Sequence, residues 1–132
     1  MNQYELKAQR QSLGFTVLQV SEHVKLTKRS WQYLETGKIK IPVRVKDVMQ
    51  YQKIRYNKLL ELITSDIAKH NITSLPFFVS LESYTAVTGD KSPLNHKIWQ
   101  SVLGHLLLTG ELKSVCDTDT ISTDYELLIW FD

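Results

Sequence analysis

The chain has 132 residues, of which 42% are hydrophobic, and a formal net charge of +2 at pH 7. Its lone cysteine excludes an internal disulfide, no apolar run approaches the length of a membrane span, and the first ten residues lack a signal-peptide core. We therefore expect a cytoplasmic protein built as one domain or as two small units.

Charge is divided unevenly along the sequence. Residues 1–70 hold 13 Lys and Arg against 6 Asp and Glu, whereas residues 71–132 hold 3 against 8. A basic half is typical of a protein that binds nucleic acid, because Lys and Arg side chains neutralise phosphates and the release of counterions favours binding. The first half is therefore the candidate for contact with double-stranded DNA, or with RNA, since positive charge alone does not choose between them.

The sequence pattern of residues 15–40 predicts two short amphipathic helices joined by a tight turn. Thr16 can cap the first helix and, with Gln19 three residues later, complete a capping box. Thr27 can cap the second helix, and Gly37 follows the point where that helix should end. This arrangement is typical of a helix-turn-helix, which reads DNA with its second helix in the major groove.

The second helix has an apolar side and a polar side. Trp31 and Leu34 share one side and are expected to anchor the helix. Arg29 can pair bidentately with guanine and Gln32 with adenine, so these two are predicted base contacts. The alternative is that they are ordinary solvated residues of a surface helix. Predicted contacts to the DNA backbone are Thr27, Lys28, Thr36, Lys38 and Lys40.

A long helix is predicted after Pro42, extending to about His70. Its apolar residues recur at spacings of four and three, nearly as a heptad. They are Val45, Met49, Gln52, Tyr56, Leu59 and Ile63. This helix is either a spine that leads to a dimer-forming region or an ordinary core helix.

Three shorter elements are expected downstream. Residues 76–79 predict an edge strand or extended link, residues 81–88 a helix ended by Gly89, and residues 95–108 an amphipathic helix followed by Gly110. The last helix is so apolar that one protomer supplies too little surface to cover it, so we expect a homodimer. The predicted interface residues are Leu59, Ile63, Ile98, Trp99, Val102 and Leu106.

The tail, residues 117–132, has five acidic residues, no basic ones, and ends in YELLIWF. It can dock on its own chain or on the partner protomer, or it can be a recognition element for another protein, such as a toxin. We favour docking, because an exposed apolar run of this kind would invite aggregation.

Motifs in both halves resemble a known family. The order LKAQRQSLGFT, VLQVSEHV and SWQYLETGK, followed by a proline, resembles the Cro/cI-type (xenobiotic-response-element, XRE) helix-turn-helix family. More narrowly, NQYELKAQRQSLGFTV, SWQYLETGK and HKIWQSVLGHLL resemble the YdiL-like group, which includes anti-CRISPR-associated autoregulators. The resemblance covers about residues 1–113 and implies a homodimer that binds an inverted-repeat operator and represses its own promoter or operon.

The resemblance also assigns roles to individual residues. It implies a structural ion pair between Arg10 and Glu35, a base contact for Ser30 and backbone contacts for Tyr33 and Gln19. The sequence departs from the family pattern at two positions, Ser21, where alanine is usual, and Lys25, where glycine is usual. We expect Lys25 to need either a left-handed backbone or an altered turn.

These observations predict a mainly α fold. A lambda-repressor-like helix-turn-helix bundle (residues 1–42) is joined by a long helix to a small, mostly helical dimerisation region with one short strand (residues 43–116). Residues 117–132 form the acidic and apolar tail. The four histidines are scattered without metal-ligand spacing, and no glycine-rich phosphate loop or nucleophile elbow is present, so we predict no enzyme, metal or cofactor.

The predicted function is that of a homodimeric, sequence-specific DNA-binding autorepressor. The alternative is an antitoxin-like protein-interaction module, in which the C-terminal region binds another protein and DNA or RNA binding is secondary.

Overall fold

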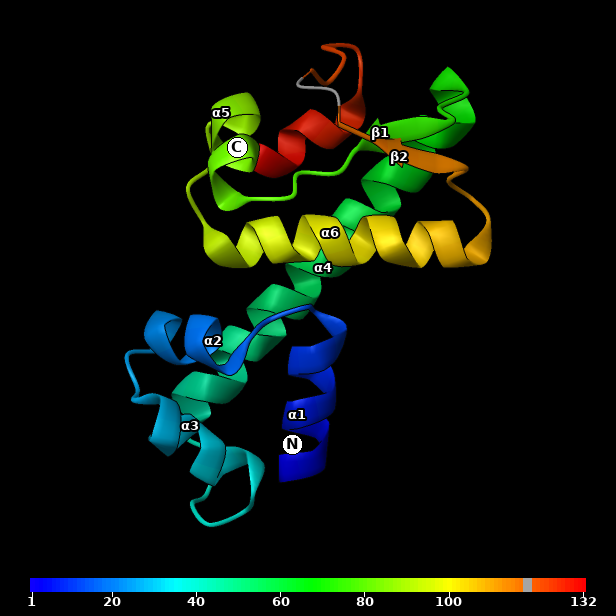
Figure 1. The fold of residues 1–132 in the computed structure, drawn as a ribbon. Helices are drawn as coiled ribbons and strands as arrows, with labels where there is room; N and C mark the ends of the chain where they lie inside the picture. Colours follow the sequence, from blue (N-terminus) through cyan, green and yellow to red (C-terminus); the bar gives the residue numbers. More distant parts are fainter. Residues whose placement is uncertain (118–119) are drawn as a thin grey trace. The chain divides into compact units, whose positions relative to one another are not determined.

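A computed structural model describes residues 1–117 and 120–132, and it is mainly helical with one two-stranded sheet (Figure 1). This confirms the predicted fold class. The chain divides into two units, Met1–Ile54 (unit 1) and Arg55–Asp132 (unit 2). The boundary lies inside α4 (Val43–His70), the predicted long helix. In the described part of the chain, no helix is long and apolar enough to span a membrane.

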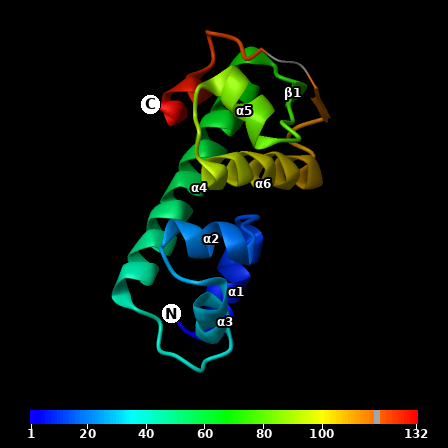
Figure 2. The ribbon, with the colours of Figure 1, turned by 60° about the vertical axis from the view of Figure 1, so that its left-hand side comes forward.

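Unit 1 consists of three short helices and the first half of α4. The three are α1 (Gln3–Ser12), α2 (Val17–His23) and α3 (Lys28–Glu35), which Figure 2 shows gathered together. Their apolar sides meet in a shared core, because the buried positions recur at helical spacing. This core includes Leu6, Val20, Trp31, Leu34 and Val45.

The helix starts in unit 1 are fixed by the predicted caps. The Thr16 hydroxyl accepts from the backbone N–H of Gln19, and the Gln19 side chain accepts from the backbone N–H of Thr16, both at 3.1 Å. The Thr27 hydroxyl accepts from the backbone N–H of Ser30 at 3.0 Å. Between α2 and α3, Lys25 has a φ of +59°, so of the two alternatives expected at this position the left-handed backbone is the one present.

Unit 2 contains the rest of α4 and five further elements. They are β1 (Ser74–Pro76), α5 (Leu81–Thr88), α6 (Pro93–Thr109), β2 (Ser114–Cys116) and the 3-10 helix η1 (Glu126–Phe131). The two strands pair in parallel, with Leu75 opposite Val115. β1 begins two residues before the predicted strand, and β2 was not predicted, because three residues carry too little alternation to reveal a strand.

The six residues predicted to form a dimer interface lie inside unit 2. Each has an exposed fraction of 0% in the single chain. The indole N–H of Trp99, for example, donates to the carbonyl oxygen of Pro76 at 2.8 Å, and its ring lies 5.8 Å from that of Phe131. In the structure of the single chain, these six side chains are therefore covered by unit 2 itself.

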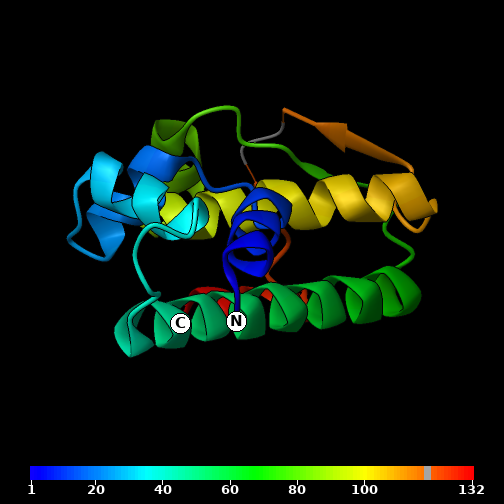
Figure 3. The ribbon, with the colours of Figure 1, turned by 90° about the horizontal axis from the view of Figure 1, so that it is seen from below.

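The tail docks on its own chain along α4 (Figure 3). Both carboxylate oxygens of the fully buried Asp66 cap η1, accepting from the backbone N–H groups of Glu126 (2.8 Å) and Leu127 (2.7 Å). The guanidinium of Arg55 donates to the Trp130 carbonyl at 2.7 Å and lies 4.1 Å from the centre of its indole ring. The favoured docking of the tail on its own chain is therefore present in residues 120–132, with Leu127 and Trp130 buried, and residues 118–119 lie outside the described residues.

A surface ion pair adds to this docking. The Lys69 ammonium donates to a Glu126 carboxylate oxygen at 2.6 Å, and the Ser65 hydroxyl donates to the other at 2.9 Å. The hydrogen bond between the two charged groups raises the pKa of Lys69 and lowers the pKa of Glu126. Both side chains are about half exposed, so this pair contributes less than the buried Asp66 cap.

The Asp66 cap predicts a specific loss of stability. Asp66→Asn replaces one accepting oxygen by an amide donor and leaves one buried N–H of η1 unpaired, which should lower the free energy of unfolding by about 1 to 3 kcal/mol. Urea denaturation measures this difference. Asp124→Asn, at an exposed tail carboxylate, is the matched control and should change little. Equal stability of the two variants would contradict the capping role.

Candidate nucleic-acid interface

α3 has one buried side and one exposed side. Trp31 and Leu34 are 0% and 2% exposed and hold the helix against unit 1. Arg29 and Gln32 are both exposed, and the amide of Gln32 forms no hydrogen bond with the described residues. The two predicted base-reading side chains therefore lie on the solvent side of a helix that is anchored by its other side.

Tyr33 organises two cations next to this exposed side. The Nε–H of Arg29 donates to the Tyr33 hydroxyl oxygen at 2.7 Å, and the guanidinium carbon lies 5.6 Å from the centre of the ring. The Lys38 ammonium lies 4.8 Å from the same ring centre. Since only the Nε of Arg29 is engaged, both terminal nitrogens stay available to pair with a base edge.

A second cluster fixes α3 against α1. Arg10 donates from Nε and Nη2 to the two carboxylate oxygens of Glu35, at 2.6 and 3.1 Å, so the expected ion pair is present. The same guanidinium donates to the carbonyl of Phe15 at 2.9 Å, and the indole N–H of Trp31 donates to Glu35. These two charged side chains are only 11% and 8% exposed, so they brace the fold and do not face solvent.

Other predicted contact residues are partly engaged within the chain. The hydroxyl of Thr27 caps α3 and donates to the Ser30 hydroxyl at 2.8 Å, while Gln19 is occupied by the capping box of α2. Thr36 donates weakly to the Tyr33 carbonyl, at 3.3 Å. Lys28, Lys38 and Lys40 are exposed. These lysines are thus the predicted backbone contacts whose charged groups the chain leaves most accessible.

Arg44 has a role that the sequence did not indicate. Its positive charge alone would suggest a phosphate contact, but in the structure its Nη1 donates to the carbonyl of Val24, the C-cap of α2. A cation at this end of a helix satisfies a free carbonyl and complements the helix dipole. No local pattern could have revealed the contact, because the two residues are 20 positions apart.

Unit 1 as a whole carries the positive charge. It contains 10 Lys and Arg against 4 Asp and Glu. One of its cations, Arg10, forms the buried ion pair with Glu35. The cations of α3 and of the loop that follows it are exposed. The exposed cations therefore surround the polar side of α3, as expected of a surface that approaches phosphates.

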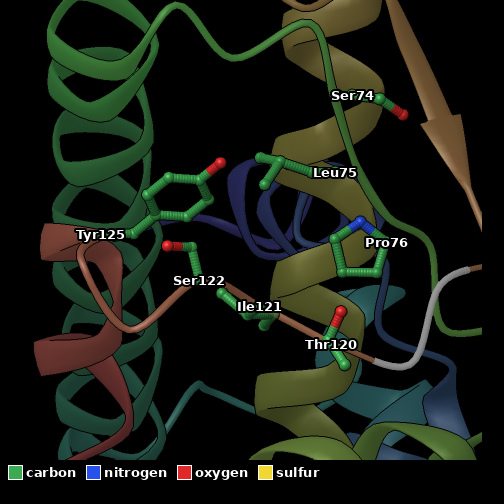
Figure 4. A pocket seen from close by; sticks show the side chains of 7 residues that line it. All are labelled: Ser74, Leu75, Pro76, Thr120, Ile121, Ser122 and Tyr125. Atoms are coloured by element: carbon green, nitrogen blue, oxygen red, sulfur yellow. The ribbon is translucent and has the colours of Figure 1, made fainter.

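A separate hollow lies in unit 2, between β1 and the tail (Figure 4). It has a volume of about 310 Å³ and is lined by Ser74, Leu75, Pro76, Thr120, Ile121, Ser122 and Tyr125. Leu75 and Tyr125 point toward one another across it, whereas the Ser74 hydroxyl points away from Tyr125. Among its described lining residues, Tyr125 is the only titratable one.

Comparison with known proteins relates the chain to one family. A family model described as Aca2/YdiL-like matches residues 1–116. The chain is 30% identical over 122 residues to a protein of Escherichia coli (strain K12) named YdiL, covering 88% of this chain and 100% of that relative. It is 29% identical over 104 residues to the Aca2 repressor of Pectobacterium phage ZF40, covering 77% of this chain and 89% of that relative. The chain belongs to the Aca2/YdiL-like family.

Proposed function

We propose that this protein is a homodimeric, sequence-specific DNA-binding repressor that places α3 in the major groove of an inverted-repeat operator in its own promoter. The observation that carries the proposal is the exposed side of α3, where Arg29 and Gln32 face solvent while Trp31 and Leu34 anchor the helix. The name of the relative in phage ZF40, a repressor, supports the same function.

The residues divide into two groups by the type of contact they make. Arg29 reads guanine with its terminal nitrogens, and Gln32 reads adenine with its amide. Ser30, whose hydroxyl is already bonded to Thr27, makes a smaller base contact. The backbone contacts position the helix without reading sequence. They are Gln19, Thr27, Lys28, Tyr33, Thr36, Lys38 and Lys40.

Dimerisation has a physical purpose in this function. α3 has 8 residues and offers few side chains to base edges, so one protomer makes few specific contacts. Two copies that read two successive major grooves multiply the affinity and impose a fixed half-site spacing.

An antitoxin-like role through the tail is the weaker candidate. The apolar side chains of Leu127 and Trp130 are 0% and 1% exposed, so they are not available to a partner protein. Deleting the tail would remove part of the core of unit 2 and would not separate the two functions.

The operator assay described below tests whether the protein prefers DNA to RNA. It is run with duplex RNA of the same sequence as competitor.

Substitutions in α3 and the following loop should have different effects on DNA binding. Arg29→Ala should cost about 1 to 3 kcal/mol on the operator and relax discrimination at one base position, because it removes a bidentate base contact. Lys38→Ala should weaken binding to all sequences about equally and reduce the salt slope. Mobility shifts on operator and random duplexes over a salt series measure both effects. Equal loss on both duplexes for Arg29→Ala would remove it from base readout.

Tyr33→Phe tests whether the phenol orients Arg29. This variant keeps the ring beside Lys38 but removes the oxygen that accepts from the Nε of Arg29. Operator affinity should fall by about 0.5 to 1.5 kcal/mol with an unchanged salt slope. In an Arg29→Ala background the same change should cost less, because the part of its effect that acts through Arg29 is already lost. Additive losses would show that Tyr33 acts independently of Arg29.

The operator should contain two half-sites with centres about one helical turn, roughly 10 base pairs, apart. Inserting half a turn of DNA between them should sharply weaken binding, because the two readers would then face different sides of the duplex. Footprinting on the promoter and titration of the spacing series measure this. A single half-site that competes as well as the full repeat would contradict the proposed dimeric mode.

A further inference from the structure

The turn between α2 and α3 has a backbone conformation that is unusual for the residue it carries. In the described part of the chain, a residue of positive φ follows each of the six α-helices within two positions. Five of these residues are of the two types that tolerate this conformation best, namely Gly14, Gly37, Asn71, Gly89 and Gly110. The sixth, after α2, is Lys25, with a φ of +59°. Because the Cβ of Lys25 crowds a backbone carbonyl oxygen in this conformation, lysine lowers the stability of the turn relative to glycine.

The end of α2 does not depend on the Lys25 side chain. The backbone N–H groups of Lys25 and of the next residue donate to the carbonyls of Glu22 and Ser21, at 3.1 and 2.9 Å. Any residue except proline supplies the same two donors. Arg44 donates to the Val24 carbonyl and already places a cation at this end of the helix. The choice of lysine therefore has another reason than the capping of α2.

The Lys25 ammonium is exposed and unpaired. Within the described residues it forms neither an ion pair nor a side-chain hydrogen bond, although the Glu22 carboxylate is only three positions earlier in the sequence. Arg10 of the same unit, by contrast, is buried against Glu35. The positive charge of Lys25 is thus available to a molecule outside the chain.

Lys25 lies at the start of the candidate reading helix. It comes two residues before Thr27, the N-cap of α3, and three residues before Lys28, the first residue of that helix. When a helix-turn-helix binds DNA, the N-terminal part of the second helix contacts base edges in the major groove, while the first helix crosses the DNA backbone. The turn that joins the two helices is therefore close to the phosphates at the edge of that groove.

We propose that Lys25 binds a backbone phosphate at the edge of the groove that α3 enters. The inference rests on the proposed function for the placement of α3 on DNA. An ammonium group pairs with a phosphate as a point charge and releases a counterion, so this contact adds affinity without reading sequence. The chain thus keeps a strained lysine where glycine would give a more stable turn but no charge.

Opposite effects on stability and on DNA binding distinguish this contact from a structural role. Lys25→Gly removes both the strain and the charge. It should raise the midpoint of thermal unfolding by roughly 2 to 4 °C and lower the affinity for DNA about fivefold to tenfold for each bound chain at about 0.1 M salt. Lys25→Asn removes the charge with a residue that tolerates the turn, and it should lower the affinity equally. Lys25→Arg keeps the charge and should bind within about twofold of the wild type.

Mobility shifts on operator and random duplexes over a salt series measure these affinities with the full chain, and circular dichroism measures thermal unfolding. For Lys25→Gly and Lys25→Asn, the slope of log affinity against log salt should become shallower by about 0.9 for each bound chain, equally on both duplexes. Lys53→Asn is the matched control, because it removes an exposed lysine of unit 1 outside residues 16–36. It should change neither the affinity nor the slope.

Three results would overturn the phosphate contact. They are an unchanged salt slope in Lys25→Gly and Lys25→Asn, a loss in Lys25→Arg as large as that in Lys25→Asn, or a lower thermal midpoint in Lys25→Gly, which would make the lysine a structural residue. The wild type tests the proposed function separately. A wild type that prefers operator DNA, with Lys25 variants that bind as it does, refutes the contact alone. A wild type that binds both duplexes equally, with shallower slopes in the variants, refutes the repressor and keeps the contact.

Discussion

The buried contact between Arg10 and Glu35 is the interaction on which the candidate nucleic-acid interface depends. It joins α1 to α3, and the same two side chains also bind the Phe15 carbonyl and the Trp31 indole. Because a buried charge without its partner is strongly destabilising, all these contacts form together or not at all. The exposed side of α3 is therefore presented on a rigid frame, and Tyr33 only has to orient the flexible ends of Arg29 and Lys38.

One side of α4 is buried in the chain, and the other side is exposed to solvent. Inward, Leu59 and Ile63 are fully buried and Asp66 caps the tail. On the opposite side, Tyr51 and Ile54 are exposed to solvent among charged residues. A single helix of 28 residues thus contributes to the cores of both units. The heptad-like pattern seen in the sequence marks the side of α4 that packs against the rest of the same chain.

Local features of this fold were predictable, and non-local ones were not. The caps at Thr16 and Thr27 depend on neighbouring residues, so their spacing reveals them. The left-handed backbone at Lys25 was one of two alternatives raised by the family pattern. The Arg10–Glu35 pair was reached only through resemblance to a family. The contact of Asp66 with η1 joins residues that are 60 positions apart, so no local pattern indicates it. The apolar pattern of α6 shows that one face of the helix is buried, but not which other segment covers that face. Arg44 shows the same limit for the site, since charge alone does not distinguish a cap from a phosphate contact.

The docking of the tail also sets an order of events during synthesis. Asp66 is synthesised 60 residues before Glu126, whose backbone N–H it binds. At a synthesis rate of about 5 to 20 residues per second, the Asp66 carboxylate therefore has no partner for roughly 3 to 12 seconds. Unit 1 contains all its own elements by Ile54 and can fold during that interval. On the ribosome, a nascent chain can therefore complete unit 1 before unit 2 can close its core.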